Sequence, residues 1–235
     1  MQSVSVAMAS YNGEKYIKEQ LESILKQLKD TDEVIISLDP STDATEQVIA
    51  SLKDKRIQVI PGPGKGVKKN FENAIIHCKN DIIFLSDQDD IWLDGKVEGV
   101  LSAFNEDTMV VMHDATIVDN DYKVLMPSFF KMKNVNTGFI HNLIKNGYIG
   151  CCMAFRRELV KYIVPIPTKI YMHDQWIGMV GDECGENVLI QKSYLYYRRH
   201  GDNVSEIHHG TILEMLVKRI HALEAYFELK RRMKK

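Results

Sequence analysis

Short apolar runs alternate with amphipathic segments along the first 110 residues. The runs are rich in Val and Ile and are bounded by polar, Gly or Pro residues, which is typical of buried strands. They lie at residues 4–10, 33–39, 56–61 and 81–86. Apolar residues at helical spacing predict intervening helices over residues 14–28, 43–52 and 68–78. Strands that alternate with helices in this way predict an α/β fold with a parallel sheet wound in right-handed crossovers.

The pattern is less regular after residue 110. Strands are predicted at residues 109–119, 150–157 and 187–201, and a helix is predicted to begin at His173. The chain ends in a helical pattern over residues 211–235. Six apolar residues fall on one stripe of that helix: Leu213, Leu216, Val217, Ile220, Leu223 and Phe227. The C-terminal segment is therefore predicted to be an amphipathic helix.

The composition is typical of a globular protein, with 235 residues of which 45% are hydrophobic and 26% charged. A chain of this length can bury a substantial core. No apolar run approaches the roughly 18 residues that a membrane helix needs, and no basic stretch precedes the first strand. We therefore expect a cytoplasmic protein. The four cysteines have no Cys-x-x-Cys spacing, so we expect reduced thiols rather than zinc ligands or disulfides.

The net charge of -2 conceals a basic C-terminus. Residues 211–235 contain seven Lys or Arg and three Glu. A basic amphipathic helix can lie peripherally on the anionic inner face of a cell membrane, pack on its own protein, or join a second copy in a homodimer. The sequence leaves these alternatives open. Because the preceding residues are acidic and lack interleaved aromatic and basic side chains, we do not expect nucleic acid as a partner.

Polar residues follow each of the four predicted strands in the first half. In a parallel sheet, ligands bind outside the carboxyl ends of the strands, and these ends meet at one edge. The segments after the strands are Ser10-Tyr11-Asn12-Gly13, Asp39-Pro40-Ser41, Gly62-Pro63-Gly64-Lys65-Gly66 and Asp87-Gln88-Asp89-Asp90. The sequence therefore predicts a ligand-binding crevice with carboxylates at its mouth.

The acidic segment after the fourth strand suggests a metal site. In an extended chain, Asp87 and Asp89 point to the same side. Adjacent carboxylates repel unless a cation or a hydrogen-bond donor neutralises them. Mg²⁺ and Mn²⁺ favour carboxylate and diphosphate oxygens, so the pattern favours a divalent cation beside a diphosphate. The alternative is an acidic loop or helix cap without a ligand.

Three motifs in order, VSVAMASYNGEKYI, SLDPSTDAT and FLSDQDDIW, resemble family 2 nucleotide-sugar glycosyltransferases of the GT-A fold. The resemblance extends to rhamnosyltransferase-like bacterial enzymes that build surface polysaccharides. It implies a Rossmann-like, mostly parallel sheet flanked by helices, in a catalytic domain over residues 1–210. Within it, residues 1–110 would bind the nucleotide and residues 111–210 the acceptor, with the helix of residues 211–235 appended. The implied reaction is inverting transfer of a hexosyl or deoxyhexosyl group from a UDP- or dTDP-sugar to a saccharide or lipid-linked acceptor.

The resemblance assigns the donor nucleotide to residues at the strand ends. Tyr11 would stack on the base, and the Asp39 carboxylate would accept a hydrogen bond from the ring N–H of the base. Apart from the resemblance, Lys65 lies in a Gly-rich loop from which it can reach a phosphate, and the alternative is a solvated loop without a ligand. The expected donor-binding set is Ala9, Tyr11, Asn12, Glu14, Asp39, Lys65, Asp87 and Gln88.

The metal, the base and the acceptor are assigned by the same resemblance. Asp89 would be the main ligand of Mn²⁺ or Mg²⁺, with Asp87 and His200 beside it. Asp174, at a predicted helix start, would be the general base that takes the proton of the acceptor hydroxyl. An Asp also suits a helix start for dipole reasons alone. The implied acceptor-binding residues are Gly150, His173 and Trp176.

Two other functions remain compatible with an acidic crevice. A nucleotidyltransferase acting on sugar phosphates also carries a carboxylate pair, but it usually has a Gly-rich, basic loop after the first strand, and SYNGEKY is not such a loop. A non-catalytic carbohydrate-binding module would not need a metal pair, a base and a base-stacking Tyr together. Both alternatives are weaker than glycosyl transfer on these grounds.

Overall fold

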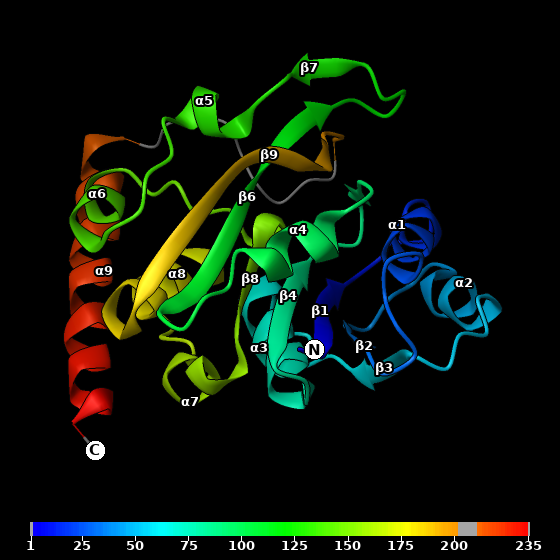
Figure 1. Cartoon of the computed structure of the whole chain (residues 1–235), viewed down its shortest axis with the longest axis horizontal. Coiled ribbons are helices and arrows are strands. Elements are labelled where there is room, and N and C mark those ends of the chain that lie inside the picture. Colours follow the sequence, from blue (N-terminus) through cyan, green and yellow to red (C-terminus); the bar gives the residue numbers. More distant parts are fainter. Residues whose placement is uncertain (1, 202–210, 235) are drawn as a thin grey trace.

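One mixed β-sheet forms the centre of the protein (Figure 1). The computed structural model describes residues 2–201 and 211–234. Its strands are β1 (Val4–Ser10), β2 (Glu33–Leu38), β3 (Ile57–Pro61), β4 (Ile82–Ser86), β5 (Ile91–Trp92), β6 (Thr108–Val118), β7 (Val124–Met126), β8 (Met153–Arg156) and β9 (Glu186–Arg198). Within the described part of the chain they pair in the order β3-β2-β1-β4-β8-β6-β9-β5, and β7 pairs with β6.

Helices flank the sheet and connect its strands. The α-helices are α1 (Ile17–Leu25), α2 (Thr45–Ser51), α3 (Val67–His77), α4 (Lys96–Ser102), α5 (Phe129–Lys133), α6 (Phe139–Ile144), α7 (Val160–Ile163), α8 (His173–Cys184) and α9 (Ile212–Met233). Two 3-10 turns, η1 (Gly150–Cys152) and η2 (Arg157–Leu159), flank β8. Helix α3 packs on β1 and β2, and α8 packs on β6 and β9.

The first half of the chain confirms the predicted parallel sheet. β1 lies between β2 and β4, and β3 lies at the edge, with all these pairs parallel. Every residue of β1 and β4 is buried. Their continuous apolar runs are explained by the helices, which cover both faces of a parallel sheet.

The second half joins this sheet through an antiparallel strand. β8 pairs antiparallel with both β4 and β6, and β6 pairs parallel with β9. The sheet is therefore more mixed than the mostly parallel sheet that was expected. The predicted strand over residues 150–157 is shorter, because Gly150–Cys152 form the turn η1. That turn brings Gly150 against α8, where a Cβ on Gly150 would lie 2.8 Å from His173 Nε2.

The predicted C-terminal helix is confirmed as α9, which runs along the outer edge of the molecule (red in Figure 1). It contacts α6, α7 and α8. The buried side of α9 carries Ala222, Ala225 and Leu229, whose small or compact side chains permit close packing. In the described residues, no helix is sufficiently long and apolar to span a bilayer.

Candidate active site

A cavity of about 800 Å³ opens at the carboxyl ends of β1, β2 and β4, where the sequence predicted a crevice. Its wall combines the loops after these strands with the starts of α3 and α8, the turn η1 and the end of β9. The predicted site residues in the wall are Ala9, Tyr11, Asn12, Glu14, Asp39, Asp87, Gln88, Asp89, Gly150, His173, Asp174 and His200. Residues far apart in the sequence thus meet at one cavity.

Two predicted site residues are not among those that line this cavity. Near the Gly-rich loop, the cavity is lined by Gly66 and Val67 and not by Lys65. Trp176 is fully buried in the core, and its Nε1 donates a hydrogen bond to the carbonyl oxygen of Ile163 at 2.8 Å. Neither Lys65 nor Trp176 therefore enters the site proposed below.

Gln88 joins the ends of β4 and β1. Its Oε1 accepts hydrogen bonds from Ser10 Oγ at 2.7 Å and from Tyr11 N at 3.0 Å, and its Nε2 donates to Tyr11 O at 2.9 Å. A Cβ on Gly13 would lie 2.3 Å from Gln88 Oε1, so a larger residue at this position would force the Gln88 amide to move. The Gln88 amide therefore holds the loop that leaves the Tyr11 ring exposed at the cavity.

Three other predicted donor-binding side chains also build the loops around the cavity. Asp39 Oδ1 accepts a hydrogen bond from Gly64 N at 2.7 Å. Glu14 Oε2 accepts from Ala44 N, and Asn12 Oδ1 accepts from Thr42 N, both at 2.9 Å. These hydrogen bonds tie the segments after β1, β2 and β3 together, so the wall on this side is preorganised.

Asn70 also lines this side of the cavity, and the sequence did not single it out. Its Nδ2 donates to Ser10 O at 3.1 Å. Its Oδ1 is buried and has no hydrogen-bond partner within the described residues. A helical Asn that follows two lysines carries no local signal of a binding role, because only the packing of α3 on β1 turns it toward the cavity.

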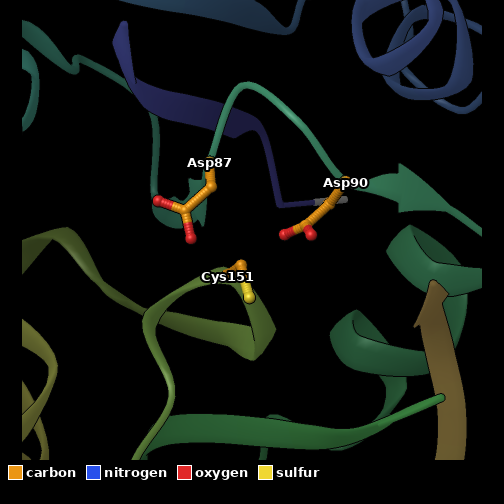
Figure 2. A group of neighbouring side chains, drawn as sticks. All are labelled: Asp87, Asp90 and Cys151. Atoms are coloured by element: carbon orange, nitrogen blue, oxygen red, sulfur yellow. The ribbon is translucent and has the colours of Figure 1, made fainter. Parts of the chain in front are cut away.

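An acidic cluster lies at the exit of β4 (Figure 2). Ligand atoms of Asp87, Asp90 and Cys151 all lie within 4.8 Å of one another. Burial, and the charges of Asp89 and Asp174, raise the pKa of Asp87 to about 7. Burial also raises the pKa of Asp90 well above its usual range, and Asp90 Oδ2 has no hydrogen-bond partner in the part of the chain that the structure describes. Without a cation, these carboxyl groups therefore hold their protons more tightly than exposed carboxyl groups do.

These residues fit a hard divalent cation. Such a cation prefers carboxylate oxygens, which Asp87 and Asp89 offer on the cavity side. Burial raises the pKa of the Cys151 thiol well above its usual range, so Cys151 stays protonated and is a poor ligand for such an ion. His200 Nε2 lies 2.9 Å from Asp89 Oδ2, and the His200 ring stacks on Tyr16 with centroids 4.6 Å apart.

A buried lysine lies beneath the acidic cluster. Lys96 is fully buried, its Nζ donates to Cys151 O at 2.8 Å, and the ammonium group lies 4.0 Å from the centroid of the Trp92 ring. Burial lowers the pKa of Lys96 to about 8. The sequence pattern gives no sign of this role, because a lysine just after Asp-Gly at a helix start normally faces solvent.

Arg198 holds the acidic loop from the other side. Its backbone N donates to Asp90 Oδ1 at 3.1 Å, and its Nε donates to Asp89 O at 3.0 Å. The guanidinium group also pairs with Glu19 of α1 at 2.7 Å. Arg198 thereby connects β9, the acidic loop and α1, which are distant in the sequence.

Asp174 and His173 begin α8 and face the cavity. Burial raises the pKa of Asp174 to about 6, although the backbone N–H groups of Gln175 and Gly150 oppose this shift by hydrogen bonding. His173 is buried and stacks on Phe71, with centroids 4.1 Å apart. Neither ring nitrogen of His173 has a hydrogen-bond partner among the described residues, and burial lowers its pKa to about 3. The site thus pairs a carboxylate that titrates near neutrality with a neutral imidazole.

Residues 5–164 match the sequence model of Glycosyl transferase family 2, which is more than half of the chain. The chain belongs to glycosyl transferase family 2. This membership confirms the resemblance on which the residue assignments rest. It favours glycosyl transfer over both the nucleotidyltransferase and the non-catalytic module.

Three curated relatives illustrate the family. The dTDP-rhamnosyl transferase RfbG of Shigella flexneri is 41% identical over 83% of this chain and 72% of the relative. The UDP-Glc:alpha-D-GlcNAc-diphosphoundecaprenol beta-1,3-glucosyltransferase WfgD of Escherichia coli is 28% identical over 63% of this chain. The chain spans 57% of the length of WfgD and 66% of that of a Nostoc glycosyltransferase, which is 26% identical over 85% of this chain.

Solved structures confirm the GT-A fold. TarS of S. aureus in complex with UDP-GlcNAc has a TM-score of 0.71 and 20% identity, over 99% of this chain and 72% of the TarS chain. Glucosyl-3-phosphoglycerate synthase of Mycobacterium tuberculosis, in complex with Mn²⁺, UDP and phosphoglyceric acid, has a TM-score of 0.61 and 15% identity, over 97% of this chain and 78% of that one. At these identities the similarity concerns the fold.

Proposed function

We propose that this family 2 glycosyltransferase is an inverting, divalent-metal-dependent enzyme of polysaccharide biosynthesis. It moves a hexosyl or deoxyhexosyl group from a UDP- or dTDP-sugar to a saccharide or lipid-linked saccharide. The observation that carries this proposal is the meeting, in one cavity, of Asp87 and Asp89 with Asp174. An acidic metal site and a carboxylate with a raised pKa are the two groups that the reaction requires.

The donor nucleotide occupies the side of the cavity built by the ends of β1 and β2. The exposed ring of Tyr11 stacks on the base, and Asp39 accepts from its ring N–H while holding Gly64. Asn70 Oδ1 is a further acceptor on this side. The donors in the names of the relatives, a dTDP-sugar for RfbG and UDP-Glc for WfgD, support a uridine or thymidine diphosphate.

The metal is Mn²⁺ or Mg²⁺, as supported by the Mn²⁺ in the Mycobacterium tuberculosis neighbour. Asp89 would be the main ligand and Asp87 would supply a second carboxylate, while His200, which contacts Asp89, would complete the set. When bound, a divalent cation neutralises the charge that develops on the departing diphosphate. Lys96 and Arg198 hold the acidic loop in place from behind.

Asp174 acts as the general base on the acceptor side. The acceptor hydroxyl oxygen forms a bond to the anomeric carbon while the bond from that carbon to the diphosphate oxygen breaks, and the hydroxyl proton passes to Asp174. The nucleoside diphosphate leaves from the opposite face, which inverts the anomeric configuration. The neutral imidazole of His173 hydrogen-bonds an acceptor hydroxyl, and Gly150 leaves room for the sugar.

The arrangement of these residues supports the expected division of the chain. The donor-side residues Tyr11, Asp39 and Asp87 lie within residues 1–110, and the acceptor-side residues His173 and Asp174 lie within residues 111–210. His200 crosses this division because it contacts Asp89.

The test is thermal stabilisation by a panel of sugar nucleotides. The protein should unfold at a higher temperature with Mn²⁺ and a UDP- or dTDP-linked sugar, and less so with GDP- or CMP-linked sugars, because only bound ligand stabilises the folded state. The best donor should then be hydrolysed slowly without acceptor. Equal stabilisation by every nucleotide class, or none by any, would reject the assignment of the donor.

A further inference from the structure

Helix α9 presents its apolar stripe to solvent. The α9 stripe comprises Leu213, Leu216, Val217, Ile220, Leu223 and Phe227, and each of these side chains is at least 36% exposed. The opposite side of the helix packs on the body through Ala222, Ala225 and Leu229. The stripe extends over about 20 Å at the usual helical rise. A contiguous exposed row of large apolar side chains marks an interaction surface.

Helix α6, which contacts α9, also carries exposed apolar side chains. Ile140 and Ile144 lie one helical turn apart on α6 and are 72% and 62% exposed. Arg219 of α9 donates a hydrogen bond to the carbonyl oxygen of Ile144 at 2.9 Å, which holds the two helices together at this point. The exposed apolar surface thus involves two helices that contact each other.

The charge that accompanies the stripe is positive. Residues 211–235 contain seven basic and three acidic side chains. Glu224 pairs with Lys169, Glu228 pairs with Arg232, and Glu214 accepts from Thr211 N in a capping box at the helix start. The acidic side chains are thus engaged locally, whereas Arg231 and Lys234 extend an exposed basic end beyond the stripe. This combination is complementary to anionic lipid headgroups above an acyl layer.

The stripe lies on the helix that borders the acceptor side of the cavity. The Nζ atom of Lys218 lies 3.7 Å from the ring centroid of Tyr171, and Tyr171 is followed by Met172, which lines the cavity. The Lys169–Glu224 pair, 2.9 Å apart, holds the same segment against α9. Helix α9 therefore contacts the segment that leads into the cavity wall at Met172, two residues before Asp174.

We infer that the α9 stripe binds an anionic lipid surface, with its apolar side chains at the boundary of headgroups and acyl chains and its basic end on the headgroups. A second copy is the less favourable occupant, because it would bring together two helical segments that each carry a net charge of about +4. The inference rests on the proposed function in one respect, which is the lipid-linked acceptor. If the stripe binds the membrane, such an acceptor would approach Asp174 from that membrane.

The test is cosedimentation of the full chain with vesicles. The protein should bind vesicles made of equal parts of phosphatidylcholine and phosphatidylglycerol, and bind vesicles of phosphatidylcholine alone more weakly. Ile220→Glu should lower the partition coefficient at least about tenfold, because it removes an apolar side chain that the lipid would bury and adds a negative charge. Arg231→Ala and Lys234→Ala should each lower it about fivefold, and high salt should reduce the effect of both.

The matched control is Ile76→Glu on α3. Ile76 is 52% exposed and Ile220 is 54% exposed, so the two substitutions are equal in chemistry and similar in exposure. Ile76→Glu should leave vesicle binding unchanged, and both variants should keep the thermal stability of the parent protein. Equal losses for the two variants, or no binding of the parent to anionic vesicles, would overturn the inference.

Light scattering tests whether the α9 stripe binds a second copy of the chain instead of lipid. A dimer that Ile220→Glu dissociates, and that does not bind vesicles, would assign the stripe to a second copy and overturn the lipid assignment. Stabilisation by Mn²⁺ and a sugar nucleotide needs no vesicle, so it tests the proposed function separately. Absence of vesicle binding with intact nucleotide binding would reject this inference and leave the proposed function standing.

Discussion

The ammonium group of Lys96 donates a hydrogen bond to the carbonyl oxygen of Cys151 at 2.8 Å, beneath a cluster of carboxyl groups. This contact connects two segments that are distant in the sequence, since Lys96 begins α4 and Cys151 lies in η1, just before β8. A buried cation at this place offsets part of the charge of Asp87 and Asp90.

Replacing this cation should make the stability of the protein more sensitive to pH. Lys96→Met leaves Cys151 O without its donor and the carboxyl groups without a nearby positive charge, so we expect a loss of about 1–3 kcal/mol in the free energy of unfolding at neutral pH. The loss should be smaller at about pH 5, because the pKa of Asp87 is raised to about 7 and its carboxyl group is protonated there. Urea unfolding at both pH values measures this, with the exposed Lys123→Met as control. Equal losses at both pH values would contradict the role in charge compensation.

The transfer reaction should depend on the ionisation of Asp174. Its pKa is raised to about 6, and a general base acts in its deprotonated form, so kcat/KM should rise with pH through about 6 and then level off. Asp174→Asn should lower kcat by about 10²–10⁴-fold and abolish this rise, while nucleotide binding is kept. A variant that retains transfer would place the base elsewhere.

Without metal, the stability of the protein should fall as pH rises. The pKa of Asp87 in the folded protein is raised to about 7, so the folded state holds this proton more tightly than the unfolded state does. The resulting stability is present at low pH and is lost as pH rises through about 7. Thermal unfolding in EDTA should show this trend, and Mn²⁺ should oppose it most at the higher pH, where the carboxylates are charged. An identical trend with and without Mn²⁺ would argue against a cation at Asp87.

Removing Asp89, the proposed main metal ligand, should uncouple nucleotide binding from the metal. Asp89→Ala should lose most of the stabilisation that Mn²⁺ adds in the presence of UDP or dTDP, because a carboxylate that would hold the cation beside the diphosphate is removed. The exposed Asp121→Ala is the control and should behave as the parent protein. Unchanged, EDTA-insensitive binding in Asp89→Ala would exclude the proposed metal role.

The close approach of the Gln88 side chain to Gly13 should matter for donor binding. In Gly13→Ala, the added Cβ would lie 2.3 Å from Gln88 Oε1, so the hydrogen bonds of Gln88 to Ser10 and Tyr11 must break or shift. We expect at least a roughly tenfold weaker affinity for the sugar nucleotide, measured by calorimetry, since the loop that presents Tyr11 is displaced. Gly201→Ala is a suitable control. Apart from its chain neighbours, no described residue has an atom within 4 Å of where a Cβ on Gly201 would lie. Equal affinities for both variants would refute the role of this loop.

The sequence alone determined the parts of the protein that local patterns encode. The apolar runs of β1 to β4 and the helical spacing of α1, α3 and α9 depend on neighbouring residues only. Once those strands are parallel, their carboxyl ends must meet at one edge, and this places Tyr11, Asp39 and Asp87 at one cavity. The motifs after the strands therefore predicted both the family and most of the cavity wall.

Only the tertiary structure decided which side chains turn inward where distant segments converge. Lys96 and Arg198 resemble ordinary surface residues in the sequence, and they support the acidic loop because η1 and β9 bring a carbonyl group and a strand end to it. The buried side of α9 was decided in the same way. Ala222 and Ala225 are buried on the side of α9 that packs on the body, where α9 contacts α6, α7 and α8, and the apolar stripe is left exposed. The reason is that packing depends on the surface that receives a helix as well as on the helix itself.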